Sequence, residues 1–243
     1  MNDRSFLRLG AAAAVVGALL ALAGNLLHPR FGDIADVDLY RKIAGSDRWL
    51  TSDLLIIAAL VLSTAGLVAI ARSLHGGGMD GALARYAGVA AMVGGAMAIM
   101  QTGVDAFAFR QAARAFSGAP AQDLVGAFWA TNAIDKLGVA LFATWTFVFL
   151  GVVPLLLAAA AFRTRRYPLA MTTVGAIGGL GCAVVGVVNL VRLDQSATEI
   201  PFLVGSLLVT AWLLWAGVVL WQQTADEGRA VQAAQPFGRP ATA

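Results

Sequence analysis

The chain has 243 residues, of which 59% are hydrophobic and only 13% are charged, with a formal net charge of +3 and a mean hydropathy of +0.75. Soluble domains carry about 25% charged residues, so this composition excludes a soluble globular enzyme, a disordered chain and a coiled coil. One cysteine and two histidines also exclude an internal disulfide and any multi-cysteine zinc or iron–sulfur site. An integral membrane protein remains, and we expect it to hold no metal and no cofactor.

Six stretches are long and apolar enough to cross a membrane. A spanning helix needs about 20 mostly apolar residues, because the hydrocarbon core is about 30 Å thick and a helix rises about 1.5 Å per residue. No charged side chain interrupts any of the six, as the high cost of a charge at the bilayer centre requires. The sequence therefore predicts an all-α bundle in a single domain, residues 1–222, with spans at 9–27, 54–71, 86–104, 137–162, 169–191 and 201–221.

The first span also has an interpretation as a cleaved signal peptide. Arg4 and Arg8 precede it, and residues 21–23 form a small-x-small cleavage site. We favour a retained helix, because the apolar run continues to Leu27 and is longer than the usual signal core of about 7–15 residues.

Local signals predict where some helices begin and bend. Thr51, Ser52 and Asp53 offer side-chain oxygens to the free amides that open the second span. Pro154 lies inside the fourth span, where it removes one backbone hydrogen bond and predicts a kink.

The outer connections are expected to carry short amphipathic segments, and the tail is expected to be disordered. In the first connection, Leu39 and Tyr40 follow two capping aspartates, and Gly45 ends the helix. The third connection, 107–136, contains a helical stretch that would form a helix of about 43 residues if it joined the fourth span, so a bend or an outer amphipathic segment is expected near Asn132. Residues 223–243 are polar and lack apolar periodicity, which predicts a disordered cytoplasmic tail.

The orientation follows from the distribution of arginine. Counts of Lys and Arg in alternate connections barely differ, but Arg163, Arg165 and Arg166 lie in a short turn directly between two spans. Because short loops rich in Arg stay in the cytoplasm, this turn is predicted to be cytoplasmic, and with six spans both termini share its side.

Polar side chains gather toward the outer third of the spans, whereas the inner half is almost purely apolar. Asn25 and Asp53 lie at this level, together with the candidate members of a polar vestibule: Gln101, Asp105, Asn132, Asp135, Lys136, Asn189 and Arg192. Such a vestibule would open to the outside, with Asp105, Asp135 and Lys136 as its ionisable groups. The other interpretation is a set of interfacial caps and snorkelling side chains. Neighbours on a helix do not face each other, so Lys136 is expected to pair with Asp105 rather than with Asp135.

The two histidines do not form a cofactor site. His28 ends the first span and His75 ends the second, which puts them on opposite sides, about 30 Å apart. One haem iron cannot bind both, and we interpret them as interfacial histidines.

Small residues repeat every four positions in the fifth span, at Gly175, Gly179 and Ala183. Such a stripe lets helix backbones approach closely. It serves either packing within the chain or a homodimer, and the sequence leaves both open.

Residues 147–181, FVFLGVVPLLLAAAAFRTRRYPLAMTTVGAIGGLG, combine a long span, a short basic turn, Tyr-Pro and a glycine-rich span. This run resembles the late part of a family of six-helix bacterial membrane proteins known as domain of unknown function number 4386. Residues 49–74 are similar to the second helix of that family. The resemblance implies the six-helix fold and supplies no active site.

The functional expectation follows from what the sequence contains and lacks. It shows no glycine-rich phosphate loop, HExxH motif or nucleophile elbow, so we expect no catalytic residues and no enzyme. Without a basic stripe, no nucleic-acid partner is expected either. The leading hypothesis is a structural or ligand-binding component of a bacterial plasma membrane, surrounded by lipid. The alternative is a small transporter or proton-coupled permease that uses the vestibule, although Pro154 alone hints at the broken helices common in transporters.

Overall fold

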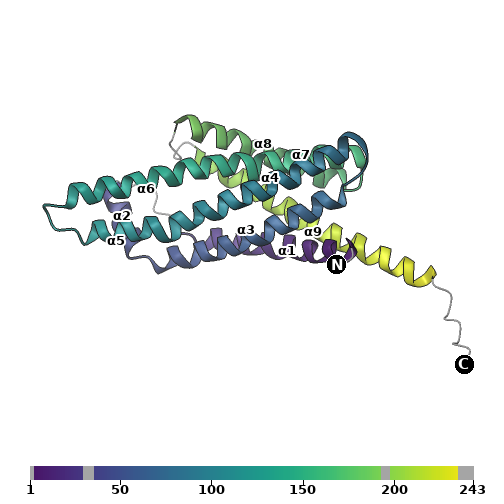
Figure 1. Ribbon diagram of the computed structural model, residues 1–243, viewed down its shortest axis with the longest axis horizontal. Coiled ribbons are helices and arrows are strands. Elements are labelled where there is room, and N and C mark those ends of the chain that lie inside the picture. Colours follow the sequence, from purple (N-terminus) through teal and green to yellow (C-terminus); the bar gives the residue numbers. More distant parts are fainter. Residues whose placement is uncertain (1–2, 30–35, 193–197, 235–243) are drawn as a thin grey trace, which may run out of the picture.

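The computed structural model describes residues 3–29, 36–192 and 198–234, and this part of the chain is all α (Figure 1). Its elements are α1 (Asp3–Leu27), α2 (Asp36–Ala44), α3 (Asp47–Ser73), α4 (Gly78–Gly103), the π-helical η1 (Val104–Phe109), α5 (Arg110–Ser117), α6 (Leu124–Trp145), the π-helical η2 (Thr146–Val152), α7 (Val153–Thr164), α8 (Leu169–Arg192) and α9 (Glu199–Ala234). Six helical runs in it are long and apolar enough to cross a membrane. The length and composition of these helices confirm the predicted multi-pass fold with six helices able to span a membrane.

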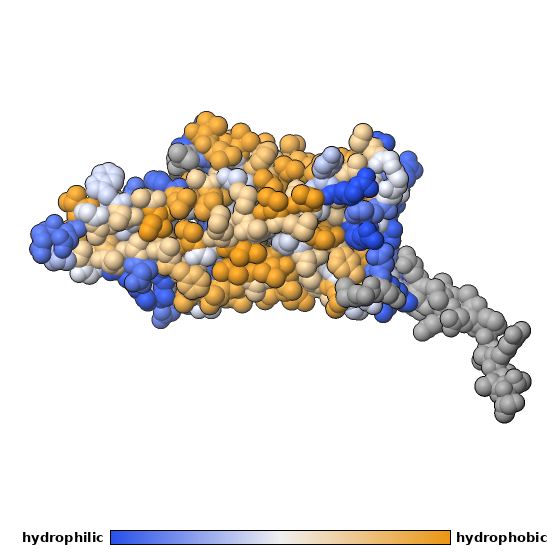
Figure 2. Space-filling model, in the orientation of Figure 1, coloured by the Kyte–Doolittle hydropathy of each residue, from blue (hydrophilic) through white to orange (hydrophobic). Residues whose placement is uncertain are grey.

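The bundle buries small side chains and exposes large apolar ones. Helix α1 buries Ala11 and Ala14 completely, whereas Leu9 and Leu26 are 63% and 73% exposed. A helix packed in water does the reverse and turns its large apolar residues to the core. Figure 2 shows this apolar surface as a band between two polar ends. Lipid is the solvent that suits such a surface, because helices in membranes pack through small residues.

Glycines set the closest approach of two neighbouring helices, α1 and α3. A Cβ atom added at Gly66 of α3 would lie 2.6 Å from the Cα atom of Ala14, and one added at Gly17 of α1 would lie 2.7 Å from the backbone nitrogen of Ser63. Because neither position has room for a side chain, the two backbones are in direct contact.

The molecule has two distinct ends (Figure 1). The N-terminus, the α3–α4 connection and the α7–α8 turn lie at one end, which we call the terminal end. Helix α2, the α5–α6 turn and the last residues of α1 lie at the other, which we call the distal end. Helix α9 runs back to the terminal end, so the start of α1 and the end of α9 lie on the same side of the spans, as an even number of crossings requires.

The third and fourth spans are much longer than predicted. They form continuous helical runs of 40 and 41 residues, Gly78–Ser117 and Leu124–Thr164, and only 118–123 connect them. Each is about 60 Å long, twice the thickness of the hydrocarbon core, so both project beyond it at the distal end. The expected long connection at 107–136 is therefore wrong.

The expected bend near Asn132 is also wrong, because α6 passes through this residue as a regular α-helix. The projecting part of α6 packs against α2 and α5 around Tyr40, Phe116 and Phe128, and this second small core stabilises a straight helix outside the bilayer. We call this unit the distal cap. The change in helical geometry comes later, at η2, which ends at Val152, two residues before Pro154. A proline has no amide hydrogen for the α-helical pattern, which is the physical reason for an irregular turn there.

Two further predictions on helix ends are corrected. Helix α3 begins at Asp47, and the side chain of Ser46, rather than those of 51–53, caps it by accepting a hydrogen bond from the Trp49 backbone nitrogen at 3.2 Å. At the other end of the chain, α9 continues to Ala234, so 223–234 are helical and not disordered. The reason is that alanine, glutamine, glutamate and arginine in this stretch favour a helix even without an apolar face. The rest of the predicted tail, 235–243, lies outside the described residues.

Candidate functional site: a buried polar network at the distal end

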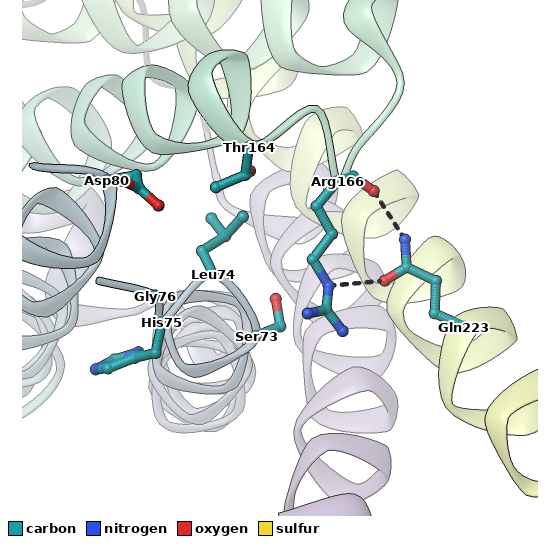
Figure 3. A pocket seen from close by; sticks show the side chains of 8 residues that line it. All are labelled: Ser73, Leu74, His75, Gly76, Asp80, Thr164, Arg166 and Gln223. Carbon is teal, nitrogen blue, oxygen red and sulfur yellow. Dashed lines mark hydrogen bonds between the residues drawn. The ribbon is translucent and has the colours of Figure 1, made fainter. Parts of the chain in front are cut away.

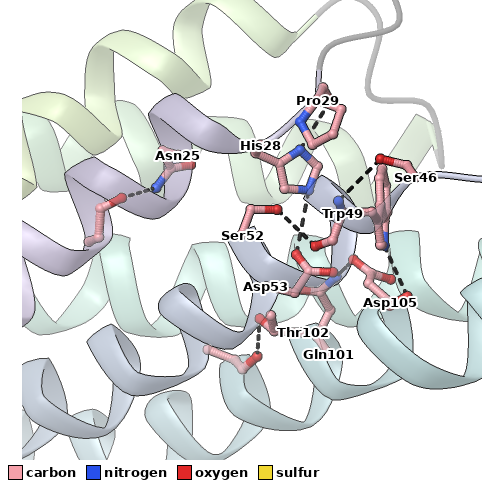
Figure 4. A network of polar contacts seen from close by, with 12 residues as sticks. Asn25, His28, Pro29, Ser46, Trp49, Ser52, Asp53, Gln101, Thr102 and Asp105 are labelled. Atoms are coloured by element: carbon pink, nitrogen blue, oxygen red, sulfur yellow. Dashed lines mark hydrogen bonds and ion pairs between the residues drawn. The ribbon is translucent and has the colours of Figure 1, made fainter.

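An imidazole–carboxylate contact joins the residue after α1 to α3 at the distal end. The Nε2 atom of His28 lies 3.5 Å from Oδ1 of Asp53, whose side chain is only 3% exposed. Gly24, one turn before His28, makes this approach feasible, because a Cβ atom there would lie 2.7 Å from Cγ1 of Ile56. Figure 4 shows the imidazole close to both Asp53 and Trp49. The centroids of the His28 and Trp49 rings lie 4.7 Å apart.

Both ring nitrogens of His28 face oxygen atoms. The Nδ1 atom of His28 lies 3.2 Å from the carbonyl oxygen of Pro29, which can only accept, so Nδ1 carries a hydrogen. The other ring nitrogen faces a carboxylate oxygen. A proton on Nε2 or on the carboxylate would turn this 3.5 Å contact into a hydrogen bond.

A second carboxylate, Asp105, lies beside this pair in η1. It interacts electrostatically with Asp53 and His28, and more weakly with Asp135. The amide nitrogen of Gln101, one turn earlier, donates a hydrogen bond to Oδ2 of Asp105. On the other side, α6 leaves room for the carboxylate, since a Cβ atom at Gly138 would lie 2.9 Å from Oδ1 of Asp105.

Two tryptophans connect the network to its surroundings. The indole nitrogen of Trp145 donates to Oε1 of Gln101 at 3.1 Å, and the indole nitrogen of Trp49 donates to the backbone oxygen of Asp105 at 3.1 Å. Trp145 is the last residue before η2, and Asp105 lies within η1. The polar contacts therefore link η1 to the residue that precedes η2, and π-helical segments are frequent at functional sites.

One polar atom in the network has no partner. The Oδ2 atom of Asp53 is buried and accepts no hydrogen bond among the described residues. A buried carboxylate oxygen without a donor is costly, typically about 1–3 kcal/mol or more. The site therefore has an open position for a proton or another donor next to His28.

The structure distributes the predicted vestibule residues over several places. Gln101 and Asp105 belong to the network, whereas Asn132 donates to the hydroxyl of Tyr40 at 3.2 Å in the distal cap. Asn189 of α8 is completely buried, and its Oδ1 accepts a hydrogen bond at 2.5 Å from the hydroxyl of Thr198, just before α9. Arg192 is exposed at the end of α8.

The predicted pairing of Lys136 with Asp105 is wrong. Its ammonium lies 3.5 Å from Oδ2 of the adjacent Asp135, and no ion pair with Asp105 forms between these described residues. The lysine side chain is 54% exposed, on the outside of α6, whereas Asp105 faces the bundle. Adjacent side chains on a helix leave the backbone in different directions. The flexible four-carbon stem of lysine nevertheless lets its ammonium reach the carboxylate of the preceding residue.

Sequence reasoning missed His28 and Asp53 as partners. It interpreted the first as an interfacial histidine and the second as a helix cap. The available signal was Ser46 followed by Asp47, a typical helix start, which places Asp53 almost two turns inside the helix rather than at its end.

The small-residue stripe of α8 is covered within the chain. Gly175 packs against the indole of Trp212 of α9, and Gly179 lies against Gly151 and Pro154, at the junction of η2 and α7. Ala183 contacts Gly151 as well. Packing within the chain thus occupies the stripe, and the homodimer stays a prediction.

Comparison with known proteins provides no guide to this site: the chain matches no protein-family model, no curated protein and no solved structure. Within 3–29, 36–192 and 198–234, no three His, Cys, Asp or Glu side chains are grouped so that they could hold a metal ion. The chemistry of the network thus has to be argued from its own groups, which are two carboxylates, an imidazole, an amide and two indoles.

Proposed function

We propose that this protein is a proton-binding component of a bacterial plasma membrane, in which His28, Asp53 and Asp105 take up and release a proton near one face of the bilayer. The observation that carries the proposal is the 3.5 Å contact of His28 with the buried carboxylate of Asp53, whose Oδ2 has no partner among the described residues, beside a second carboxylate, Asp105. Ionisable side chains inside a membrane bundle are costly, and they mark functional sites more often than other residues do.

The charge of the cluster supports proton binding. With both carboxylates ionised and His28 protonated, the cluster has a single net negative charge, and one more proton neutralises it. The neighbouring charges are already paired: Arg110 with Asp47 at 2.8 Å, and Lys136 with Asp135. A proton at the open Oδ2 of Asp53, or on Asp105, is therefore the simplest way to remove a charge that burial makes costly.

Infrared difference spectroscopy on the purified protein in lipid nanodiscs tests this proposal. Lowering the pH should produce the C=O stretch of a protonated carboxylic acid, because the site takes up a proton. The band should be lost or shifted in Asp53→Asn and in Asp105→Asn. It should be unchanged in Asp38→Asn, the matched control, whose side chain is 63% exposed on α2. A band that survives both network substitutions would contradict the proposal.

A second candidate, the proton-coupled permease, is favoured by η1 and η2. These segments interrupt the third and fourth spans, and Gln101 joins them through Asp105 and Trp145. Irregular turns in spanning helices are the elements that transporters use to build and move a binding site. Proteoliposomes with a trapped pH dye separate the candidates: a permease moves protons down an imposed gradient, whereas a binding component takes up protons without a net flux.

The proposal assigns no catalytic step, since it needs proton binding alone. It also places the terminal end in the cytoplasm, which is supported by Arg163, Arg165 and Arg166 in and beside the α7–α8 turn. Reporter fusions after residue 243 and within 76–81 should then both report a cytoplasmic position. A periplasmic signal from either would contradict this orientation.

We also keep membership in the six-helix family, domain of unknown function number 4386, as a proposal. It is supported by the six spans and by the basic turn with Tyr167 and Pro168 before the glycine-rich α8.

A further inference from the structure

A polar cavity opens at the terminal end, on the opposite side of the bundle from the proton-binding network. Its volume is about 440 Å³, within the range of small-molecule sites. Most of its lining is polar and comes from the end of α3, the start of α4, the end of α7, the α7–α8 turn and α9, through Ser73, His75, Asp80, Thr164, Arg166 and Gln223 (Figure 3).

The cavity has a cation and an anion on opposite walls. Figure 3 shows Arg166 on one side and Asp80 on the other, with Thr164 between them. Gln223 of α9 holds the arginine in place, because it accepts from Nε of Arg166 at 3.4 Å and donates to the Arg166 backbone oxygen at 2.9 Å. Asp80, in the first turn of α4, forms no ion pair with any residue that the structure describes.

The cavity lining also contains separate hydrogen-bond acceptors and donors, as it contains separate negative and positive charges. Asp80 offers two carboxylate oxygens, which only accept hydrogen bonds. The Thr164 hydroxyl donates its hydrogen to the carbonyl of Ala160 and keeps its lone pairs. One part of the lining thus accepts hydrogen bonds, as an ammonium requires, and Arg166 donates them, as a phosphate requires.

The position of the cavity along the spanning helices indicates where such a ligand comes from. Ser73 is the last residue of α3 and Thr164 the last of α7, so the cavity lies where two spanning helices leave the hydrocarbon core. At this level a membrane presents lipid headgroups, and polar pockets between spanning helices bind them. We propose that the cavity binds the headgroup of an aminophospholipid, with its phosphate at Arg166 and its primary ammonium at Asp80.

Native mass spectrometry of the full-length protein, released from detergent in the presence of defined lipids, tests this assignment. The probes are phosphatidylethanolamine, phosphatidylcholine and phosphatidylglycerol with identical acyl chains. Phosphatidylethanolamine should be retained best, by about tenfold, because its primary ammonium can donate a charge-assisted hydrogen bond to Asp80. Choline has no N–H donor for Asp80, and glycerol has no positive charge. Equal retention of the three lipids, or a preference for phosphatidylglycerol, would overturn the proposal without the need for any variant.

Two substitutions and one soluble probe complete the test. Asp80→Asn should lower retention of phosphatidylethanolamine about tenfold, to the level of phosphatidylcholine, whereas Arg166→Gln should weaken all three lipids. Arg163→Gln, an exposed arginine that does not line the cavity, is the matched control and should change nothing. Free phosphoethanolamine shares the same charged groups. If it binds as tightly as the lipid, the ligand is a soluble zwitterion and the lipid assignment is wrong.

Discussion

The hydroxyl of Tyr167 fixes the α7–α8 turn to the end of α3, and its removal has a calculable cost. Ser73 donates its single hydroxyl hydrogen to the Ile70 carbonyl at 2.7 Å, so Tyr167 is the donor in the 2.8 Å contact between the two side chains. Tyr167→Phe deletes this hydrogen bond and keeps the ring, which is 5% exposed. At neutral pH we expect a loss of about 0.5–1.5 kcal/mol in the free energy of unfolding.

The pH dependence of stability provides a sharper test of the same contact. Burial raises the pKa of Tyr167 to about 12, because the phenolate is poorly solvated between the helices, against 10.0 for an exposed tyrosine. The unfolded chain therefore releases this proton first. Stability is intact below about pH 10 and falls by about 1.4 kcal/mol per pH unit up to about pH 12, a loss of about 3 kcal/mol in all.

The assay is the unfolding transition in detergent, followed by circular dichroism from about pH 9 to about pH 12. Tyr167→Phe should lack this part of the alkaline loss. The wild type, about 0.5–1.5 kcal/mol more stable at neutral pH, should therefore draw level with the variant and then fall below it as the pH approaches about 12. Tyr86→Phe, which changes a tyrosine that is 69% exposed, is the control and should follow the wild type. Parallel curves for Tyr167→Phe and wild type would refute the reasoning.

Two further predictions concern the packing and the network. Gly66→Ala should lower the free energy of unfolding by about 1–3 kcal/mol, since its Cβ atom would lie 2.6 Å from the α1 backbone; Gly126→Ala, with nothing within 4 Å, should be neutral or stabilise by up to about 1 kcal/mol. Trp145→Phe should cost about 1–3 kcal/mol, because the buried Gln101 oxygen loses its donor. In a double-mutant cycle with Gln101→Leu, additive costs would show that this hydrogen bond contributes nothing.

The candidate site could be predicted only in part. Gln101 and Asp105 stand out in the sequence because they are polar residues at the end of an apolar run, and both belong to the network. Their partners do not stand out, since a contact between residues far apart in the chain leaves no local pattern. Lys136 failed for a different reason: helix spacing argued against the adjacent Asp135, but the flexible lysine side chain reaches Asp135 at 3.5 Å.

The sequence by itself determined the six spans. Transfer of a helix into lipid depends on the length and polarity of one stretch at a time, and both are properties of the sequence alone. The full length of the third and fourth helices is not a property of the sequence alone. Residues past the hydrocarbon core remain helical because α2, α5 and α6 pack around Tyr40 and Phe116 in the distal cap, and that packing exists only once the helices are assembled. In the same way, His28 meets Asp53 because Gly24 lets α1 contact α3 closely, a distance set by the tertiary structure and not by either residue.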